Sequence, residues 1–246
     1  MPPFESKKLS FMATAELTAH MAMNAINPAL VEKYVCLIRF LSEFPEMASA
    51  VRGKSALQIG EAKYIQHQAR IFANARGLRA PQVPATVPDA MVSVILHHYF
   101  HLPIEQLERA KQQHLLSMGV ENLVGELLEH YLASILEPHG WVWCSGAIVK
   151  AVDFIKPPEG ASDRWQMLQV KNRDNSENSS SSAIRTGTTI EKWHRTFSKK
   201  AMTNWAAFPD EKLRIQLSES AFRVYVEDYL RALPPPTGIQ APSAAS

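Results

Sequence analysis

The chain's 246 residues are 46% hydrophobic and 20% charged, which excludes a disordered protein and leaves one large domain or two closely joined parts. Two cysteines are too few for a disulfide framework or a CxxC zinc site. A net charge of +2 does not by itself indicate a nucleic-acid partner. However, residues 141–205 hold ten Lys and Arg against six Asp and Glu, so the positive charge is concentrated there.

The first 140 residues predict helices. Within residues 28–52, apolar side chains recur at helical spacing as far as a break near Pro45. The predicted helices cover residues 28–52, 56–76, 89–99, 103–116 and 121–136. No stretch approaches 18 uninterrupted apolar residues, so we expect a cytoplasmic protein without a membrane span.

The pattern changes at Gly140, where Val, Ile, Phe and Trp become frequent. Strands are predicted over residues 141–149, 150–156 and 164–172, and helices over residues 190–205 and 219–233. The helix at 190 is predicted because Thr188 and Glu191 have the spacing of a capping box. Residues 234–246 are expected to be a disordered tail. This order of elements predicts an α/β (α+β) architecture, in which helices flank a small mixed sheet.

Two of these strands place oxygen-bearing and cationic side chains together. Gln169 and Lys171 are two residues apart, so on a strand they lie on the same face. If the turn at 157–163 pairs the strands antiparallel, Asp153 can lie on that face too. Mg²⁺ prefers oxygen ligands, here the Asp153 carboxylate, the Gln169 amide oxygen and the Val170 backbone carbonyl. With Lys171 to orient a water molecule, this grouping is suited to metal-dependent phosphodiester hydrolysis.

The preceding predicted helix carries two further carboxylates, Glu126 and Glu129. They lie nearly one turn apart, so either could complete the metal shell. We favour Glu126.

Asp153 followed by Gln169-x-Lys171, after a Glu-bearing helix, resembles the PD-(D/E)xK nuclease superfamily. Within it, VGELLEHYL, GWVWCSG, VDFI and QVKNRDNSENSSSSAIR are similar to the SinI-like type II restriction endonucleases, over about residues 103–205. Two positions depart from the family pattern. Val152 stands in place of a proline, and Gln169 replaces the usual Asp or Glu. Because Gln169 removes one negative charge from the predicted metal site, a metal-binding role for the Glu126 carboxylate becomes more plausible.

The resemblance implies more than the residues show. It implies a PD-(D/E)xK core over residues 103–233, in which Asp153, Gln169, Lys171 and Glu126 are catalytic and Mg²⁺ is the cofactor. It also implies a homodimer that cuts both strands of double-stranded DNA at a short palindrome, GGWCC (W is A or T). The helical region 1–102 is then a candidate for embracing DNA or for dimerisation. A cytosine-5 DNA methyltransferase is expected as a genetic neighbour.

The polar tract 172–187 then predicts a recognition loop. Arginine can read guanine, asparagine adenine, and carboxylates the cytosine amino group, while serine serves phosphates. The candidate DNA contacts are Arg173, Asp174, Asn175, Ser176, Glu177, Asn178, Ser179 and Arg185 in the tract, with Lys192 and Arg195 on the following predicted helix. A plain polar linker is the alternative interpretation of this tract.

Two other functions remain open from the sequence. One is a structure-specific or repair nuclease of the same superfamily, which would cleave regardless of flanking sequence. The other is a DNA-binding protein whose nuclease site has decayed through Gln169, which would bind duplex DNA and cleave nothing.

Overall fold

A computed structural model describes residues 10–51, 57–82, 84–160, 164–174 and 188–234. The chain forms two compact units. The first consists of Met1–Gly77 with Glu129–Phe222, and the second of Leu78–Leu128 with Arg223–Ser246. The predicted boundary at residue 102 falls inside the second unit. The tail 234–246 lies, apart from its first residue, outside the described residues.

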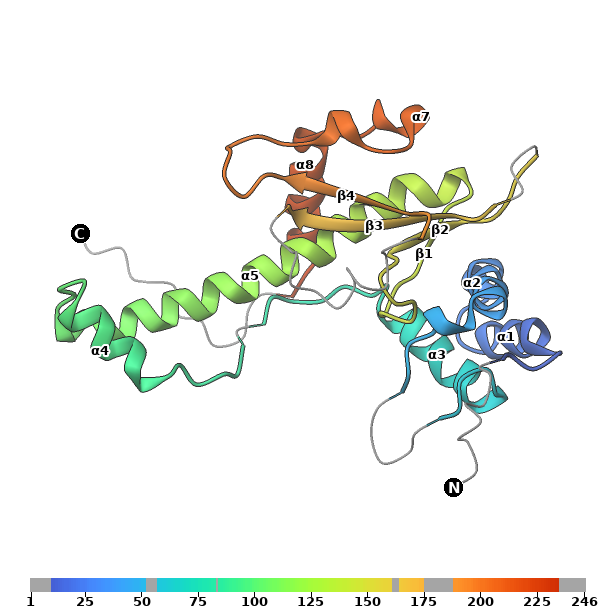
Figure 1. The fold of residues 1–246 in the computed structure, drawn as a ribbon, viewed down its shortest axis with the longest axis horizontal. Helices are drawn as coiled ribbons and strands as arrows, with labels where there is room; N and C mark the ends of the chain where they lie inside the picture. The colour runs from blue at the N-terminus through green and yellow to red at the C-terminus, as the bar shows by residue number, and fades with distance from the viewer. Residues whose placement is uncertain (1–9, 52–56, 83, 161–163, 175–187, 235–246) are drawn as a thin grey trace, which may run out of the picture. The chain divides into compact units, whose positions relative to one another are not determined.

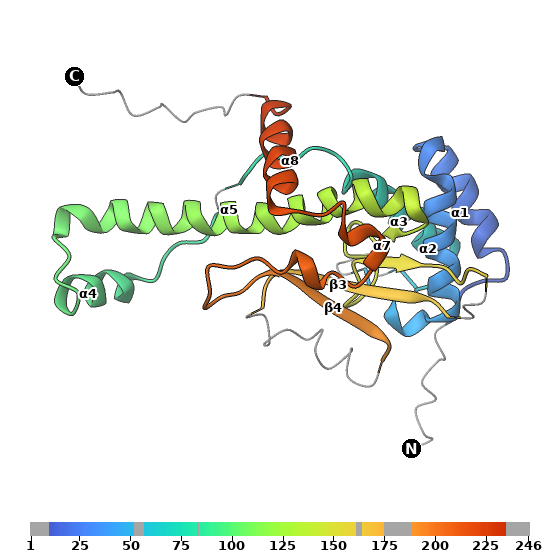
Figure 2. The same ribbon diagram turned by 90° about the horizontal axis from the view of Figure 1, so that it is seen from above.

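The first unit begins with a cluster of three helices (Figures 1 and 2). These are α1 (Ala15–Asn24), α2 (Val31–Glu43) and α3 (Ala62–Asn74), with short 3-10 turns η1 (Pro28–Leu30) and η2 (Pro45–Met47). On α2, the fully buried Tyr34, Leu37, Ile38 and Leu41 form one face, as the helical spacing predicts. Helix α1 was not predicted from the sequence, and its buried residues are two alanines, Ala15 and Ala19, and Met23.

A four-stranded mixed sheet follows in the same unit (Figure 1). Its strands are β1 (Val142–Trp143), β2 (Phe154–Lys156), β3 (Gln166–Arg173) and β4 (Ile190–Thr196), in that spatial order. β1 pairs with β2 and β2 with β3 antiparallel, whereas β3 and β4 run parallel. The predicted fold class and the predicted antiparallel hairpin are thus confirmed, although β1 and β2 are shorter than expected.

The helix predicted over residues 190–205 is wrong, because Ile190–Thr196 is the strand β4. Thr188 does not cap a helix. Its hydroxyl accepts a hydrogen bond from the Ile190 N–H at 3.4 Å, a local turn that leads into the strand. Ile190 and Trp193 are buried on opposite faces of the sheet, so the apolar spacing imitates a helix.

The two faces of the sheet have different coverings. On the Asp153 face (Asp153, Ile155, Met167, Gln169, Lys171 and Ile190), the apolar residues join the core formed with α1–α3. On the Trp193 face (Trp143, Leu168, Val170, Glu191, Trp193 and Arg195), Trp193 packs against Trp205 and Phe208, at centroid distances of 5.2 and 5.1 Å. These two aromatics lie in and just after the turn η4 (Trp205–Ala207), which precedes α7 (Glu211–Arg214).

The second unit contains α4 (Ala90–His98), part of α5 (Ile104–Leu136) and most of α8 (Glu219–Arg231). The helices predicted over 103–116 and 121–136 are one continuous helix, α5. Gly119 does not break it. A Cβ there would lie 2.3 Å from the Gln82 carbonyl oxygen, so glycine is required by the close approach of that segment. Across the described ranges, no helix is long and apolar enough to cross a membrane.

Candidate active site

The hairpin register brings Asp153, Gln169 and Lys171 to one face of the sheet. Phe154 pairs with Leu168, and the Asp153 N–H donates to the Leu168 carbonyl at 2.9 Å, which puts Asp153 opposite Gln169. Lys171 follows Gln169 by two residues on β3 and shares its face. The sequence-predicted grouping is therefore present in the folded chain.

The Asp153 carboxylate is held in place by the backbone of β3. Its Oδ2 accepts a hydrogen bond from the Val170 N–H at 2.7 Å. Among the residues that the structure describes, none donates to the other oxygen, Oδ1. Gln169 is only 2% exposed, and Lys171 is partly buried. One carboxylate oxygen is thus left for a ligand beside an enclosed side-chain amide.

This donor set fits a hard cation such as Mg²⁺. Within the described parts of the chain, no three His, Cys, Asp or Glu side chains gather as a metal cluster. A centre here would depend on the Asp153 carboxylate and on neutral oxygens, from the Gln169 amide and the Val170 carbonyl. Such oxygens suit Mg²⁺, which keeps several water ligands. Zn²⁺ prefers nitrogen and sulfur ligands.

Burial raises the pKa of Asp153 to about 6, although the Val170 N–H and the positive charge of Lys171 act in the opposite direction. The charged form is therefore costly in the metal-free protein. A cation bound at the carboxylate would offset that cost, which is the electrostatic pattern of a metal-binding acid.

We expect Asp153→Asn to stabilise the metal-free protein at pH 8. The Asp153 carboxyl binds its proton more tightly in the folded protein than in the unfolded chain. Its contribution to the free energy of unfolding is therefore fully present below pH 4 and is lost as pH rises through about 6. The loss is on the order of 2–3 kcal/mol. The asparagine amide oxygen can still accept from the Val170 N–H. Denaturant unfolding in EDTA at pH 8 and at pH 4 measures the effect, and equal differences from wild type at both pH values would contradict it.

The two candidate glutamates are separated by the structure. Glu126 belongs to the second unit, where its half-exposed carboxylate lies 3.7 Å from Arg79. Glu129 belongs to the first unit and accepts a hydrogen bond from the Trp143 indole at 2.9 Å. Because Trp143 lies on the Trp193 face, Glu129 is on the opposite face from Asp153. The part of Glu126 in metal binding stays a prediction.

The predicted DNA contacts fall into three groups. Asn175, Ser176, Glu177, Asn178, Ser179 and Arg185 lie outside the described residues. Arg173 is exposed at the end of β3, and the neighbouring Asp174 carboxylate accepts from the Ser198 N–H at 2.7 Å. That bond to the loop after β4 holds the pKa of Asp174 below its usual value. Any contact of these residues with DNA stays a prediction.

Lys192 and Arg195 lie on strand β4 and face opposite ways. Lys192 is in register with Gln169 and therefore lies on the Asp153 face. Arg195 lies on the Trp193 face, where it donates to the Asn172 side chain at 3.0 Å, pairs with Glu219 and covers the Phe222 ring at 5.1 Å. These bonds tie β4 to the first turn of α8. A phosphate contact by Arg195 stays untested.

One side chain beside the candidate site, His194, was not among the residues predicted from the sequence. His194 is in register with Lys171 across the parallel β3–β4 pair, so both lie on the Asp153 face. Only the spacing Lys192-x-His194 could have indicated it, and the predicted helix concealed the alternation.

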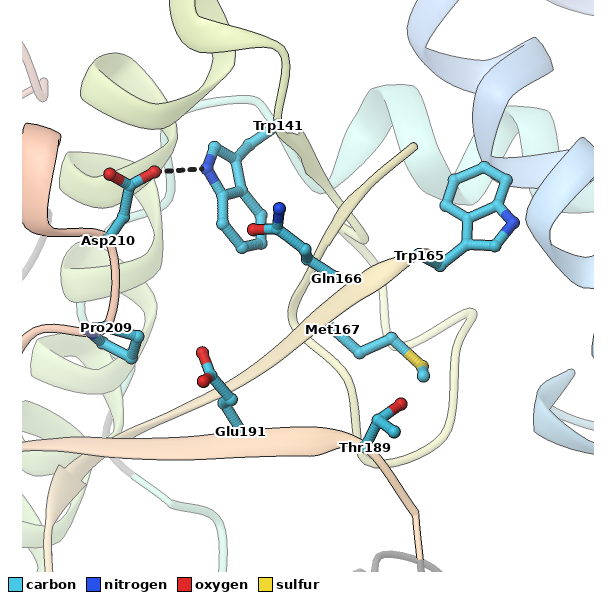
Figure 3. A pocket seen from close by; sticks show the side chains of 8 residues that line it. All are labelled: Trp141, Trp165, Gln166, Met167, Thr189, Glu191, Pro209 and Asp210. Atoms are coloured by element: carbon cyan, nitrogen blue, oxygen red, sulfur yellow. Dashed lines mark hydrogen bonds between the residues drawn. The ribbon is translucent and has the colours of Figure 1, made fainter. Parts of the chain in front are cut away.

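A hollow of about 310 Å³ lies at the other end of the same strands (Figure 3). It is walled by Trp141 and Trp165 and contains Glu191 and Asp210, with the Trp141 indole donating to Asp210 at 3.2 Å. Carboxylates would repel the phosphates of a nucleic acid. This hollow is therefore a poor candidate for the nuclease site.

The sequence profile of the SinI restriction endonuclease family matches residues 15–232. The chain belongs to this family. The match begins at α1, so the helices α1–α3 are part of the shared SinI-family sequence rather than an unrelated addition.

Two relatives agree with this assignment. The chain is 52% identical over 226 residues to the type II restriction enzyme Eco47I of Escherichia coli, covering 92% of this chain and 98% of the relative. It is 50% identical over 229 residues to the type II restriction enzyme SinI of Salmonella infantis, covering 93% and 99%. The resemblance predicted from residues 103–205 is confirmed and extends over nearly the whole chain.

Proposed function

We propose that this SinI-family endonuclease uses Mg²⁺ to hydrolyse both strands of double-stranded DNA at GGWCC and leaves 5′-phosphate ends. The observation that carries the proposal is the placement of Asp153, Gln169 and Lys171 on one face of the sheet. The relatives' names, type II restriction enzymes, support the DNA substrate. The recognition sequence depends on the family resemblance.

In this mechanism Asp153 and Gln169, with the Val170 carbonyl and Glu126, would hold the metal ion. When bound, Mg²⁺ supplies a more acidic water and charge stabilisation on the phosphodiester. Lys171 orients the attacking water and stabilises negative charge as it develops on the phosphate. The Val170 N–H fixes the Asp153 carboxylate, so that it does not reorganise during the reaction.

The position of Gln169 supports an active nuclease site rather than a decayed one. Its side chain is enclosed opposite Asp153, where a second carboxylate would raise the cost of charging both. The amide keeps an oxygen donor there without a charge. A decayed site has no such requirement for an enclosed amide opposite the carboxylate.

Recognition and assembly follow from the substrate. Arg173 at the end of β3 leads into the polar tract, which we assign to reading the bases and phosphates of the site. Because a palindromic site has two-fold symmetry, a homodimer would place one active site on each strand. We also propose that the enzyme acts in the cytoplasm and that a cytosine-5 methyltransferase gene lies beside its own.

Digestion of a sequenced plasmid with Mg²⁺, followed by sequencing of the ends, tests the proposal. We expect cuts on both strands within GGWCC and 5′-phosphate ends, and none in EDTA. Cuts at another short palindrome would reject only the assigned sequence. Cuts at junctions or unrelated sequences would favour a structure-specific nuclease, and binding without cleavage would favour the decayed site.

A further inference from the structure

His194 stands beside Lys171 on the Asp153 face and has no role in the mechanism above. In a parallel pair, residues in register project from the same side of the sheet at neighbouring positions. Lys192 stands in the same way beside Gln169. β4 therefore adds Lys192 beside Gln169 and His194 beside Lys171 on the Asp153 face. His194 is partly exposed, so a ligand on this face can reach it.

Asn204 holds His194 in a defined position. The Asn204 backbone is tied at both ends, because its N–H donates to the Arg195 carbonyl at 2.7 Å and its carbonyl accepts from the Trp193 indole at 3.0 Å. Its side-chain Nδ2 donates to the His194 carbonyl at 3.1 Å. The imidazole also packs edge-on against Phe197, at a centroid distance of 4.9 Å.

The same amide favours one of the two neutral forms of the His194 imidazole. A backbone carbonyl can only accept, so the Asn204 atom that faces it is the nitrogen. That nitrogen lies 3.4 Å from His194 Nε2, which favours Nε2 as an acceptor and leaves the proton on Nδ1. Over the described part of the chain, no group accepts a hydrogen bond from Nδ1. The orientation therefore leaves a donor on the Asp153 face.

A basic hollow adjoins this position at the carboxyl ends of β3 and β4. It has a volume of about 490 Å³ and is lined by Arg173, Arg195, Lys199, Lys200 and the chain around Phe197. Four cationic side chains, of which Arg195 is paired with Glu219, make it suited to the phosphates of a DNA strand that continues past Lys171.

We propose that the neutral imidazole of His194, positioned by Asn204, donates a hydrogen bond from Nδ1 to a phosphate oxygen of the DNA strand being cut. The proposal rests on the nuclease function and adds a phosphate-contacting residue to it. A neutral donor places the phosphate without adding to the charge beside Lys171.

Substitutions at position 194 test which nitrogen acts. The asparagine amide nitrogen occupies nearly the position of Nδ1, and the glutamine amide nitrogen nearly that of Nε2. Single-turnover cleavage of a duplex oligonucleotide containing GGWCC is measured in Mg²⁺ with excess enzyme. We expect His194→Ala and His194→Phe to slow cleavage about 10- to 100-fold. His194→Asn should recover most of that loss and His194→Gln little, while the exposed His20→Ala serves as the matched control.

DNA binding measured over a range of salt concentrations, with Ca²⁺ in place of Mg²⁺ so that no cleavage occurs, tests whether the His194 imidazole is neutral. Loss of a neutral donor leaves the slope of log K against log[salt] unchanged, whereas loss of a charged contact lowers it by about one. If the slope falls by about one in His194→Ala, the assignment of His194 as a neutral donor is overturned. If His194→Phe cleaves as fast as wild type, the ring only packs against Phe197 and the proposal is overturned.

Asn204 is the positioning residue, and a double-mutant cycle tests it. If it acts through His194, Asn204→Ala should slow cleavage, and adding it to His194→Ala should cost nothing further. Additive losses would reject the positioning role. If the wild-type enzyme cuts GGWCC and every position-194 variant cleaves at the same rate, this inference alone is rejected. If the wild-type enzyme cuts no DNA, the proposed function is rejected, and this inference is rejected with it.

Discussion

Lys171→Ala is expected to bind its DNA site and to cleave it about 10²- to 10³-fold more slowly than wild type. Lys171 lies on the face of Asp153 and Gln169, where its ammonium can orient the attacking water and stabilise charge that develops only in the transition state. Binding depends mainly on contacts elsewhere along the DNA. Single-turnover cleavage in Mg²⁺ and equilibrium binding in Ca²⁺ separate the two effects.

Lys156→Ala is the matched control for this prediction. Lys156 is also a strand lysine, on β2, but alternation places it on the Trp193 face, and its partner is Glu159 at 3.5 Å. It should therefore cleave like wild type. Full activity in Lys171→Ala would remove Lys171 from the mechanism. Equal losses in both variants would indicate a general effect of lysine removal rather than a role at the site.

Arg76→Ala is expected to lower the free energy of unfolding by about 3–5 kcal/mol, because it leaves a buried carboxylate without its main partner. Arg76 donates to the Glu137 carboxylate at 2.8 Å, and the two side chains are only 12% and 9% exposed. The guanidinium also donates to the Trp143 carbonyl at 2.8 Å and to the Ser145 hydroxyl at 3.1 Å. It thereby joins the end of α3 to η3 (Glu137–His139) and β1.

The exposed pair of Arg39 and Glu16 is the control. Its side chains are 51% and 48% exposed, so Arg39→Ala should cost at most about 1 kcal/mol. Denaturant unfolding at pH 7 measures both variants. Equal losses would show that the Arg76 cluster contributes no more than a surface pair. Replacing both partners, by Arg76→Met with Glu137→Leu, should recover part of the loss, because no charge is then left buried.

The Glu137 cluster also predicts acid sensitivity. Burial alone would raise the pKa of Glu137, but the hydrogen bonds and charges of Arg76 and Lys33 prevail and hold it below its usual 4.5. The stabilisation from a lowered carboxyl pKa is present above pH 4.5 and is lost as pH falls through the folded pKa. The difference between wild type and Arg76→Ala should therefore shrink in acid. A difference that is constant from pH 7 to pH 3 would contradict this assignment.

The centre of the candidate site could be predicted because it depends on local geometry. Asp153, Gln169 and Lys171 lie within a single hairpin, and strand alternation with a short turn is enough to bring them to one face. Most helices of the first 140 residues were predictable for the same reason, since their apolar spacing is a property of each segment alone. The division of α5 into two predicted helices was wrong, because Gly119, which lies in the gap between them, serves a close contact with Gln82 within one continuous helix.

Only the tertiary structure decided β4 and what lies on it. Ile190–Thr196 becomes a strand because it pairs with β3 in parallel and buries Ile190 and Trp193 on opposite faces of the sheet, and neither condition can be read from the segment itself. That pairing places His194 beside Lys171 and turns Arg195 to the opposite face. The sequence by itself thus determined the family and the residues of the hairpin. Long-range pairing determined which further side chains share their face.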